Sequence, residues 1–318
     1  MSTPVYFVLT PNYLALDFAG PAEVLRIAAD EGLALTLFTV GPERLCRSSL
    51  GLVSEIDPLP DALPDKALLV LVGTVDEARD YQGEPALRLV GWLASRLRAD
   101  THVACICSGA LIAAMAGLLD GRRCTTHHAL TDALRTLAPT ALIEENRLFV
   151  EDGPLATSAG ITAGVDLALR LVERLGGVEL AARVARRMVV WARRSGADPQ
   201  LPPQLAARKH LHPAVHRAQD ALDADPARSW TLAELARLAC VSERHLSRLF
   251  REHAGCSVGA YRQALQLARA RAALEQGATV EAAASEAGFD NARTLRRLWR
   301  AHYGEAPAAG RARAALAR

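Results

Sequence analysis

Aromatic residues are scarce in this 318-residue sequence, in which Phe, Trp and Tyr together make up 5%. Half of the residues are nevertheless apolar, so the interior must be filled mainly by Ala, Leu and Val. A chain of this length can form one large and one small core. The composition therefore indicates a globular protein of two domains.

Cysteine occurs six times, at positions 46, 105, 107, 124, 240 and 256, but without disulfide-framework spacing or paired Cys-x-x-Cys sets. This pattern favours reduced thiols in a cytoplasmic protein. No basic segment followed by a small-residue cleavage site opens the sequence, so we expect no secretory signal. We also expect no cofactor.

A membrane-spanning segment is also lacking, although residues 101–119 carry no formal charge and are long enough to cross a bilayer. The first half of this run holds Thr101, His102, two cysteines and Ser108. A buried strand, a sharp turn and a buried helix explain the run better, so no membrane partner is expected.

Strand and helix patterns alternate over the N-terminal part of the chain. Strands are expected at 5–9, 34–40, 67–72, 102–106 and around Cys124, with a hairpin-like stretch at 142–157. Helices are expected at 22–29, 85–97, 109–118, 129–137, 160–175 and 178–193. This alternation predicts a flavodoxin-like, mainly parallel sheet covered on both faces, with ligands at the carboxyl ends of its strands.

Cys107 lies at such an end, where a buried strand meets a helix of small residues. This is the context of a nucleophile elbow, and a helix N-terminus there would lower the pKa of the thiol. A buried, inert thiol is the alternative. Cys105, earlier on the same strand, is expected to face the other side of the sheet and to serve packing.

Residues 231–250 have the pattern of two short helices joined by a turn at Cys240 and Val241. Thr231 and Glu234 predict a capping box for the first helix, and Ser242 can cap the second. A solvated helical hairpin would have the same pattern, but an outward basic face is also what the DNA major groove accepts. That face would carry Glu243, Arg244, Ser247, Arg248 and Arg251.

A second copy of the pattern strengthens the DNA-binding interpretation. Residues 279–304 repeat the helix, a turn with Gly288 and the second helix, and residues 257–276 predict a connecting helix that ends at Gly277. The two recognition helices start at 242 and 291, which are 49 residues apart. The outward face of the second one would carry Arg293, Arg296, Arg297 and Arg300.

The C-terminal hundred residues resemble the AraC/XylS family of transcription activators. The shared pattern is A-x-x-A-C-V-S-x-R-x-L-x-R-x-F at 236–250 and G-F-D-x-A-x-x-L-x-R at 288–297. Val258 departs from the family, which usually has Pro there. The resemblance implies two helix-turn-helix units on one rigid helix, with duplex promoter DNA and RNA polymerase as partners.

Residues 4 to about 194 resemble the ThiJ/PfpI branch of the glutamine-amidotransferase-like fold. The matches are L-D-x-x-G-P-x-E-V at 16–24, C-S-G-A at 107–110, G-L-L-D-G-R at 117–122, T-T-H at 125–127 and S-A-G-x-x-A-G-x-D at 158–166. The resemblance implies that Cys107, Asp17 and His127 share a pocket. The ligand-binding residues would be Asp17, Gly20, Cys107, Ser108, His127 and Ser158. Protease-like members have His where this chain has Ser108, which argues against peptidase chemistry.

Two of these residues have simpler explanations. Asp17 could cap a helix that begins near Pro21. His127 and His128 could be a metal-binding pair, but adjacent residues on a strand point to opposite faces, so we expect no metal.

Charge divides the chain, because residues 209–318 hold 17 Lys and Arg against 11 Asp and Glu, whereas residues 1–208 hold 20 against 24. Prolines 199, 202 and 203 indicate a linker. The predicted domains are 1–195 and 209–318, joined by 196–208. Asp198 and the Arg193–Arg194 pair are expected to be solvated charges.

Two functions are consistent with these features. The first is a sequence-specific DNA-binding transcription regulator whose N-terminal domain senses a small-molecule effector and forms a homodimer. The second is a Cys-dependent hydrolase or hydratase of the ThiJ/PfpI type with an attached DNA-binding domain. Two intact helix-turn-helix copies favour the regulator, for which no enzyme activity is expected.

Overall fold

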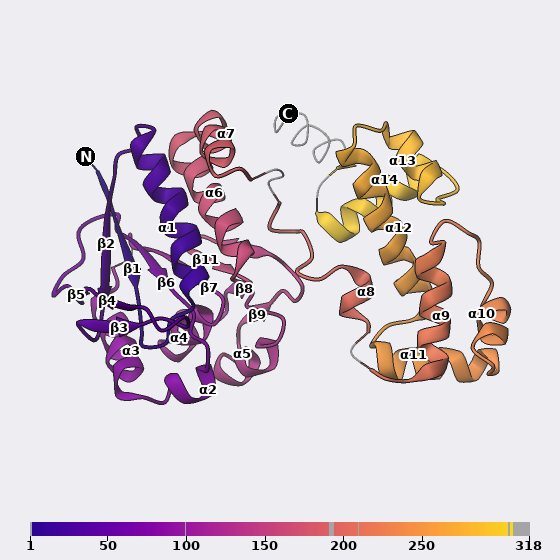
Figure 1. Ribbon diagram of the computed structural model, residues 1–318, viewed down its shortest axis with the longest axis horizontal. Coiled ribbons are helices and arrows are strands. Elements are labelled where there is room, and N and C mark those ends of the chain that lie inside the picture. Colours follow the sequence, from indigo (N-terminus) through magenta and orange to yellow (C-terminus); the bar gives the residue numbers. More distant parts are fainter. Residues whose placement is uncertain (1, 99, 191–193, 209, 305, 308–318) are drawn as a thin grey trace. The chain divides into compact units, whose positions relative to one another are not determined.

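The chain divides into two compact units, Met1–Gln200 and Leu201–Arg318 (Figure 1). The computed structural model describes residues 2–98, 100–190, 194–208, 210–304 and 306–307. The division falls within the predicted linker, 196–208. The predicted linker is not one extended segment. Its residues up to Gln200 belong to the first unit, and Pro203–Ala206 forms the short helix α8.

A seven-stranded sheet forms the centre of the first unit, in the order β10-β11-β7-β6-β1-β2-β5. Its strands are β1 Thr3–Val8, β2 Leu35–Gly41, β5 Asp57–Pro58, β6 Leu68–Leu71, β7 His102–Ile106, β10 Phe149–Asp152 and β11 Leu155–Ser158. All neighbours pair in parallel except β10 and β11, which form an antiparallel hairpin. The predicted flavodoxin-like sheet is confirmed.

Two short ribbons lie outside this sheet and were not predicted as pairs. They are the antiparallel pair of β3 Leu45–Arg47 with β4 Val53–Glu55, and the parallel pair of β8 Arg123–Cys124 with β9 Leu142–Ile143. The first ribbon is tied to the loop after β1, since the Tyr13 hydroxyl lies 3.1 Å from that of Ser54.

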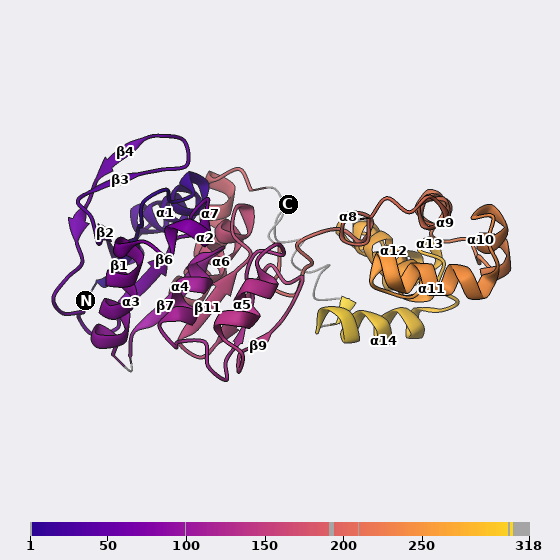
Figure 2. The same cartoon turned by 90° about the horizontal axis from the view of Figure 1, so that it is seen from below.

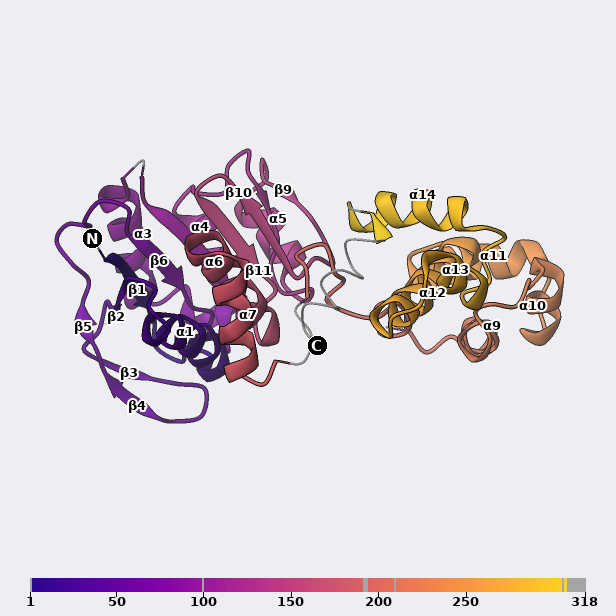
Figure 3. The ribbon, with the colours of Figure 1, turned by 90° about the horizontal axis from the view of Figure 1, so that it is seen from above.

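Helices cover both faces of the sheet, as predicted. On one face α1 Ala15–Asp30, α6 Thr162–Gly176 and α7 Val178–Arg187 lie side by side (Figure 3). On the other are α3 Glu84–Arg96, α4 Gly109–Met115 and α5 Thr131–Leu137, with the short α2 Glu77–Asp80 nearby (Figure 2). The strands therefore separate two apolar cores, which suits a parallel sheet buried on both sides.

Two helix boundaries differ from the prediction by six residues or more, and the others by three or fewer. The first helix begins at Ala15 rather than near Pro21, so that Pro21 lies inside the helix, where it cannot donate the usual bond to the Asp17 carbonyl. The helix predicted for 178–193 ends at Arg187, where Val189 adopts a left-handed φ of 54° and the Val190 amide donates back to the Ala185 carbonyl. Such a reversal ends a helix. Residues 191–193 lie outside the described part of the chain.

The segment just before the domain boundary is anchored rather than solvated. Arg194 donates from Nε to Asp166 Oδ2 over 2.9 Å, and Asp198 is buried and accepts from the Ser195 amide over 2.7 Å. The expectation of solvated charges was therefore wrong for Arg194 and Asp198, since both side chains have hydrogen-bond partners within the first unit. Arg193 is not among the described residues.

The second unit is helical and has two cores on one long helix. Its helices are α8, α9 Pro213–Ala224, α10 Leu232–Leu238, α11 Glu243–Ala254, α12 Val258–Glu275, α13 Val280–Glu286 and α14 Ala292–Tyr303. Helix α12 contributes Tyr261 and Leu265 to a core with α9, α10 and α11, and Leu267 and Leu274 to a core with α13 and α14. The predicted helix-turn-helix pairs, α10–α11 and α13–α14, and their connecting helix are confirmed.

Within the described ranges, no helix combines the length and the apolarity needed to cross a membrane. Over the same residues, no three His, Cys, Asp or Glu side chains are grouped so as to hold a metal ion.

Candidate functional site

Cys107 occupies a sharp turn between β7 and α4. Its φ of 56° is left-handed, which is uncommon for a residue with a side chain. A Cβ on Gly160 would lie 2.2 Å from Cys107 Cβ, so only glycine leaves room for this turn. The turn is held by the Cys107 amide, which donates to the Ser158 carbonyl over 3.0 Å, and by the Thr126 hydroxyl, which donates to the Cys107 carbonyl over 2.9 Å. Cys105 packs in the core on the opposite face of the sheet, as predicted.

The side chains of Asp17, Cys107 and Ser108, which come from two different segments of the chain, meet near Gly73. A Cβ built on Gly73 would lie 2.8 Å from Asp17 Oδ2, 2.9 Å from Ser108 Oγ and 3.0 Å from Cys107 Cβ. These residues follow β1, β6 and β7. The helices after the neighbouring strands β1 and β6 pack on opposite faces, and ligand sites of parallel sheets form at such a point. The structure thus brings Asp17 and Cys107 together.

Asp17 is a fully buried carboxylate rather than a helix cap. It lies in the first turn of α1, and its Oδ1 accepts the Ile161 amide over 2.5 Å at the start of α6. Ile161 has a left-handed φ of 51°, and its hydrogen bond to Asp17 helps to hold this uncommon conformation. Asp17 Oδ2 is buried and has no hydrogen-bond partner of normal geometry within the described residues.

Burial dominates the ionisation of this pair. It raises the pKa of Asp17 to about 6, although the Ile161 amide and the Cys107 thiol lower it. Burial, and then the charge of Asp17, also raise the pKa of the Cys107 thiol, against a lowering by the Ser108 amide. The expected activated thiolate was therefore wrong, because desolvation outweighs the amides at the start of the seven-residue α4. At neutral pH the thiol keeps its proton and Asp17 is mostly ionised.

The Ser108 hydroxyl is occupied by the protein itself. It accepts the Thr74 amide over 2.9 Å and the Tyr81 hydroxyl over 3.0 Å, and it donates to the Thr74 carbonyl over 3.3 Å. Ser108 is fully buried, so its hydroxyl ties the loop after β6 to the Cys107 turn. Thr74 and Tyr81 were missed at the sequence level. The position of Gly73 and Thr74 after a predicted buried strand was the available signal.

The side chains of His127 and His128 point to the same side of the chain rather than to opposite faces of a strand. Their ring centroids are 4.2 Å apart, and His127 Nδ1 accepts the Ala129 amide over 3.4 Å. The strand argument that placed the two rings on opposite faces was wrong, because residues 127 and 128 follow β8 in irregular structure. Thr126, the neighbour of His127, makes the contact with the Cys107 turn through its hydroxyl.

Gly20 and Ser158, also predicted for the pocket, have positions that serve packing. A Cβ on Gly20 would lie 2.9 Å from Val165 Cγ2, so this glycine lets α1 approach α6 closely. The Ser158 side chain is fully buried and donates toward the Cys105 carbonyl over 3.5 Å. The described geometry therefore centres the site on Asp17 and Cys107.

Helices of both helix-turn-helix copies are capped at their starts. Thr231 and Glu234 form the predicted capping box of α10, and the Ser242 hydroxyl accepts the His245 amide over 3.3 Å at the start of α11. In the second copy, Asn291 Oδ1 accepts the Thr294 amide over 2.9 Å at the start of α14. These caps satisfy amides that a helix start leaves unpaired.

The predicted outward residues of both recognition helices face solvent. Each is exposed except Ser247, which is partly exposed. The opposite faces are buried through residues such as Leu246, Phe250, Leu295 and Trp299. Arg248 pairs with Glu252 over 2.7 Å and Arg296 with Glu281 over 2.6 Å. Among the described residues, no carboxylate pairs with Arg244, Arg251, Arg293, Arg297 or Arg300.

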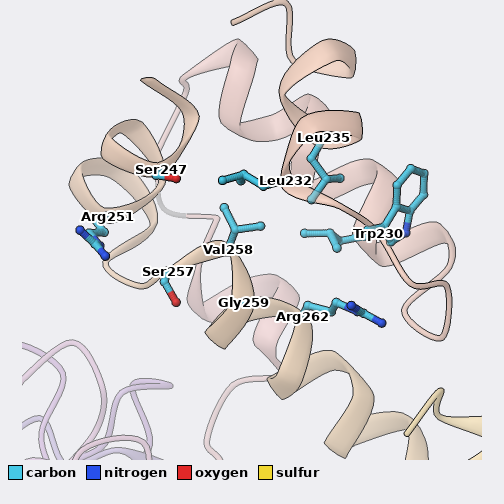
Figure 4. Close-up of a pocket in the computed structure, with 10 residues that line it drawn as sticks. Trp230, Leu232, Leu235, Ser247, Arg251, Ser257, Val258, Gly259 and Arg262 are labelled. Carbon is cyan, nitrogen blue, oxygen red and sulfur yellow. The ribbon is translucent and has the colours of Figure 1, made fainter. Parts of the chain in front are cut away.

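A pocket of about 290 Å³ opens beside α11 in the second unit (Figure 4). Ser247 and Arg251 of α11 form one side, Trp230 lies across from them, and Leu232 and Val258 point into the space between. Its rim therefore shares Ser247 and Arg251 with the outward face of the recognition helix. It is a feature of the helical unit and contains no residue of the Cys107 site.

Comparisons with known proteins cover both units. The DJ-1/PfpI family model matches residues 3–174, and the helix-turn-helix domain model matches residues 235–313. The HTH-type transcriptional regulator CdhR of Pseudomonas aeruginosa is 31% identical over 318 residues, which cover 98% of this chain and 92% of that protein. Isonitrile hydratase of Pseudomonas putida is 34% identical over 184 residues, which cover 58% of this chain and 77% of the enzyme.

Among solved structures, the crystal structure of an AraC family transcriptional regulator from Pseudomonas putida aligns with a TM-score of 0.51 and 24% identity. The alignment covers 58% of this chain and all but 1% of that one. At this identity the match concerns the fold. The regulator with nearly full-length similarity spans both units, whereas the similarity to the hydratase covers 58% of the chain.

Proposed function

This chain belongs to the DJ-1/PfpI family and, with its AraC-type helix-turn-helix domain, to the DNA-binding transcription regulators, and we propose that its Cys107–Asp17 site binds a small polar effector that controls promoter binding. The observation that carries the sensor assignment is the burial of this pair, since Asp17 is 0% and Cys107 only 5% exposed. A nucleophilic cysteine requires a thiolate, whereas burial raises the pKa of the Cys107 thiol.

The chemistry of the site indicates what the effector offers. Asp17 Oδ2 is buried without a hydrogen-bond partner of normal geometry, and such a group is costly to leave unpaired. A hydroxyl, amine or amide donor on the effector would satisfy this oxygen. The Cys107 thiol would then contact the rest of the ligand, which must be small because Cys107 is only 5% exposed.

The DNA contacts are proposed for the outward faces of α11 and α14. These residues are Glu243, Arg244, Ser247, Arg248, Arg251, Arg293, Arg296, Arg297 and Arg300. If both helices engage one face of a duplex, they would read major grooves about one helical turn, roughly 10 bp, apart. RNA polymerase is the proposed partner on the promoter, and the cytoplasm is the proposed location.

A homodimer through the first unit is also proposed. The β3–β4 ribbon exposes Leu45, Leu50, Leu52 and Val53, and all four are more than half exposed. A contiguous group of exposed apolar side chains is typical of a surface that another protein covers.

A second candidate function is supported by the similarity to isonitrile hydratase and by the Cys107 turn. Both are compatible with a Cys-dependent hydratase or hydrolase. In that case Asp17 would act on the substrate rather than hold it.

Cys107→Ser separates the two functions. Full-length protein would first be used to select duplexes from a random library, and the selected duplex would serve for anisotropy titrations. We expect the variant to retain duplex binding, because Cys107 lies in the other unit, and the parent to turn over no isocyanide, amide or aldehyde. Turnover by the parent that is lost in Cys107→Ser would establish the enzyme, and absence of duplex binding by the parent at low salt would refute the proposed DNA contacts.

A further inference from the structure

Gln200, the last residue of the first unit, is held by three hydrogen bonds. Its Nε2 donates to the Thr126 carbonyl over 2.8 Å and to the Arg147 carbonyl over 2.9 Å. Its Oε1 accepts the His128 amide over 2.8 Å. One side chain thus fixes the loop 126–128 from both sides, although Gln200 is more than 70 residues away in the sequence.

The same loop touches the effector site. The Thr126 hydroxyl donates to the Cys107 carbonyl over 2.9 Å, at the residue with the left-handed φ. Two side chains, Thr126 and Gln200, therefore connect the Cys107 turn with the point at which the chain leaves the first unit. Leu201, the next residue, begins the helical unit.

A second connection starts from Asp17 and reaches the same segment. Asp17 accepts the Ile161 amide, and the next residue, Thr162, accepts Arg194 Nη2 over 2.8 Å. Arg194 also pairs with the buried Asp166 over 2.6 Å. The carboxylate of Asp17 and the backbone carbonyl of Cys107 are thus connected, through one or two intervening residues, to residues 194–200.

Gln200 is the final anchor of this segment. The residues before it are fastened by backbone contacts, such as the Arg147 guanidinium with the Ala197 carbonyl over 2.7 Å and the Leu148 amide with the Asp198 carbonyl over 2.9 Å. A shift of the loop 126–128 would leave those contacts in place and would change the hydrogen bonds of Gln200 itself.

We propose that Gln200 is the residue that transmits occupancy of the Cys107–Asp17 site to the DNA-binding unit. This inference rests on the proposed function. An effector that displaces the Cys107 turn moves Thr126, and this movement breaks or re-forms the hydrogen bonds of Gln200. The direction in which the chain leaves the first unit at Leu201 then changes. Coupling of this kind is reciprocal, so DNA bound to the second unit must change the affinity of the Cys107–Asp17 site for its effector by the same factor, and with it the conformational equilibrium of that site.

Reciprocity allows a test without knowledge of the effector. Full-length protein would be alkylated with iodoacetamide, with and without a saturating selected duplex, and the Cys107 peptide would be followed by mass spectrometry. Because Cys107 is almost fully buried, its alkylation rate reports local opening of the site. We expect the duplex to change this rate by about 5-fold or more in the parent. In Gln200→Ala the change should fall below about 2-fold, although the variant still binds the duplex.

Two further variants separate transmission from a general loss of structure. Gln200→Glu keeps the acceptor for the His128 amide and loses both donated hydrogen bonds. The effect of the duplex on its Cys107 alkylation rate should therefore lie between the effects in the parent and in Gln200→Ala. Gln204→Ala is the matched control, because the structure records no side-chain hydrogen bond for Gln204 among the described residues, and it should behave as the parent.

The outcomes distinguish this inference from the proposed function. If the parent binds no duplex, the proposed function itself fails. If the parent binds and its Cys107 rate does not respond, or if Gln200→Ala and Gln200→Glu respond as fully as the parent, the role of Gln200 is overturned.

Discussion

The first helix-turn-helix copy turns through Cys240 and the second through Gly288, with left-handed φ angles of 57° and 76°. At Cys240 the turn leaves room for a side chain, which is exposed. At Gly288 an added Cβ would lie 2.3 Å from the Ala227 carbonyl oxygen, and Gln266 Nε2 donates to the Gly288 carbonyl over 2.9 Å. The second turn is thus packed against the segment between α9 and α10, and only glycine fits there.

The two recognition helices also differ in charge. Helix α11 carries Glu243 and Glu252 among its arginines, and Glu252 pairs with Arg248. Helix α14 has no acidic residue, and its only paired arginine among the described residues is Arg296. A face with both Glu and Arg can accept from cytosine and donate to guanine edges, whereas a uniformly basic face is suited to phosphate contacts. We therefore expect the first copy to contribute mainly base reading and the second mainly electrostatic affinity.

The largest expected effect tests the comparison of the turns. Gly288→Ala should lower the free energy of unfolding of the helical unit by about 2 to 4 kcal/mol, because it adds both a left-handed strain and an overlap with Ala227. Cys240→Ala, in a turn that already holds a side chain, should change it by less than about 1 kcal/mol. Urea unfolding of the full chain, with hydrogen exchange of α10 and α13 as local readouts, measures both. Equal effects of the two substitutions would remove the distinction.

A smaller effect tests the comparison of charge. Arg244→Ala should cost about 1 to 3 kcal/mol at one base pair of the selected duplex and little at the others, as expected for loss of a guanine contact. Arg297→Ala should weaken binding to all sequences alike and reduce the slope of affinity against salt by about 1. Anisotropy titrations against single-base variants at several salt concentrations give both quantities. A uniform loss in Arg244→Ala would reassign that arginine to phosphate.

The smallest effect concerns the caps, where the two copies should behave alike. Ser242→Ala and Asn291→Ala should each lower the free energy of unfolding by about 1 kcal/mol, because each leaves a helix-start amide unpaired. Glycine at the same positions should cost only a few tenths of a kcal/mol and serves as the control. A loss at one cap and none at the other would show that the two helix starts are not equivalent in stability.

Features with short-range causes were predictable from the sequence. The capping box of Thr231 and Glu234, the Ser242 cap and strand β7 at His102–Ile106 were predicted to the residue. Each depends on hydrogen bonds or periodicity within a few residues, which a linear pattern contains. The alternation that gave the parallel sheet, and the charge contrast between the units, are likewise properties of the sequence itself.

The chemistry of the site was decided by tertiary structure. The sequence places Cys107 at a helix start and predicts a lowered thiol pKa, yet burial raises that pKa, and the exclusion of water is a property of the assembled fold. Asp17 receives its hydrogen bond from Ile161, 144 residues away, and Gln200 reaches Thr126 across 74 residues. No local pattern records such partners, because they meet only after the sheet has brought the ends of its strands together.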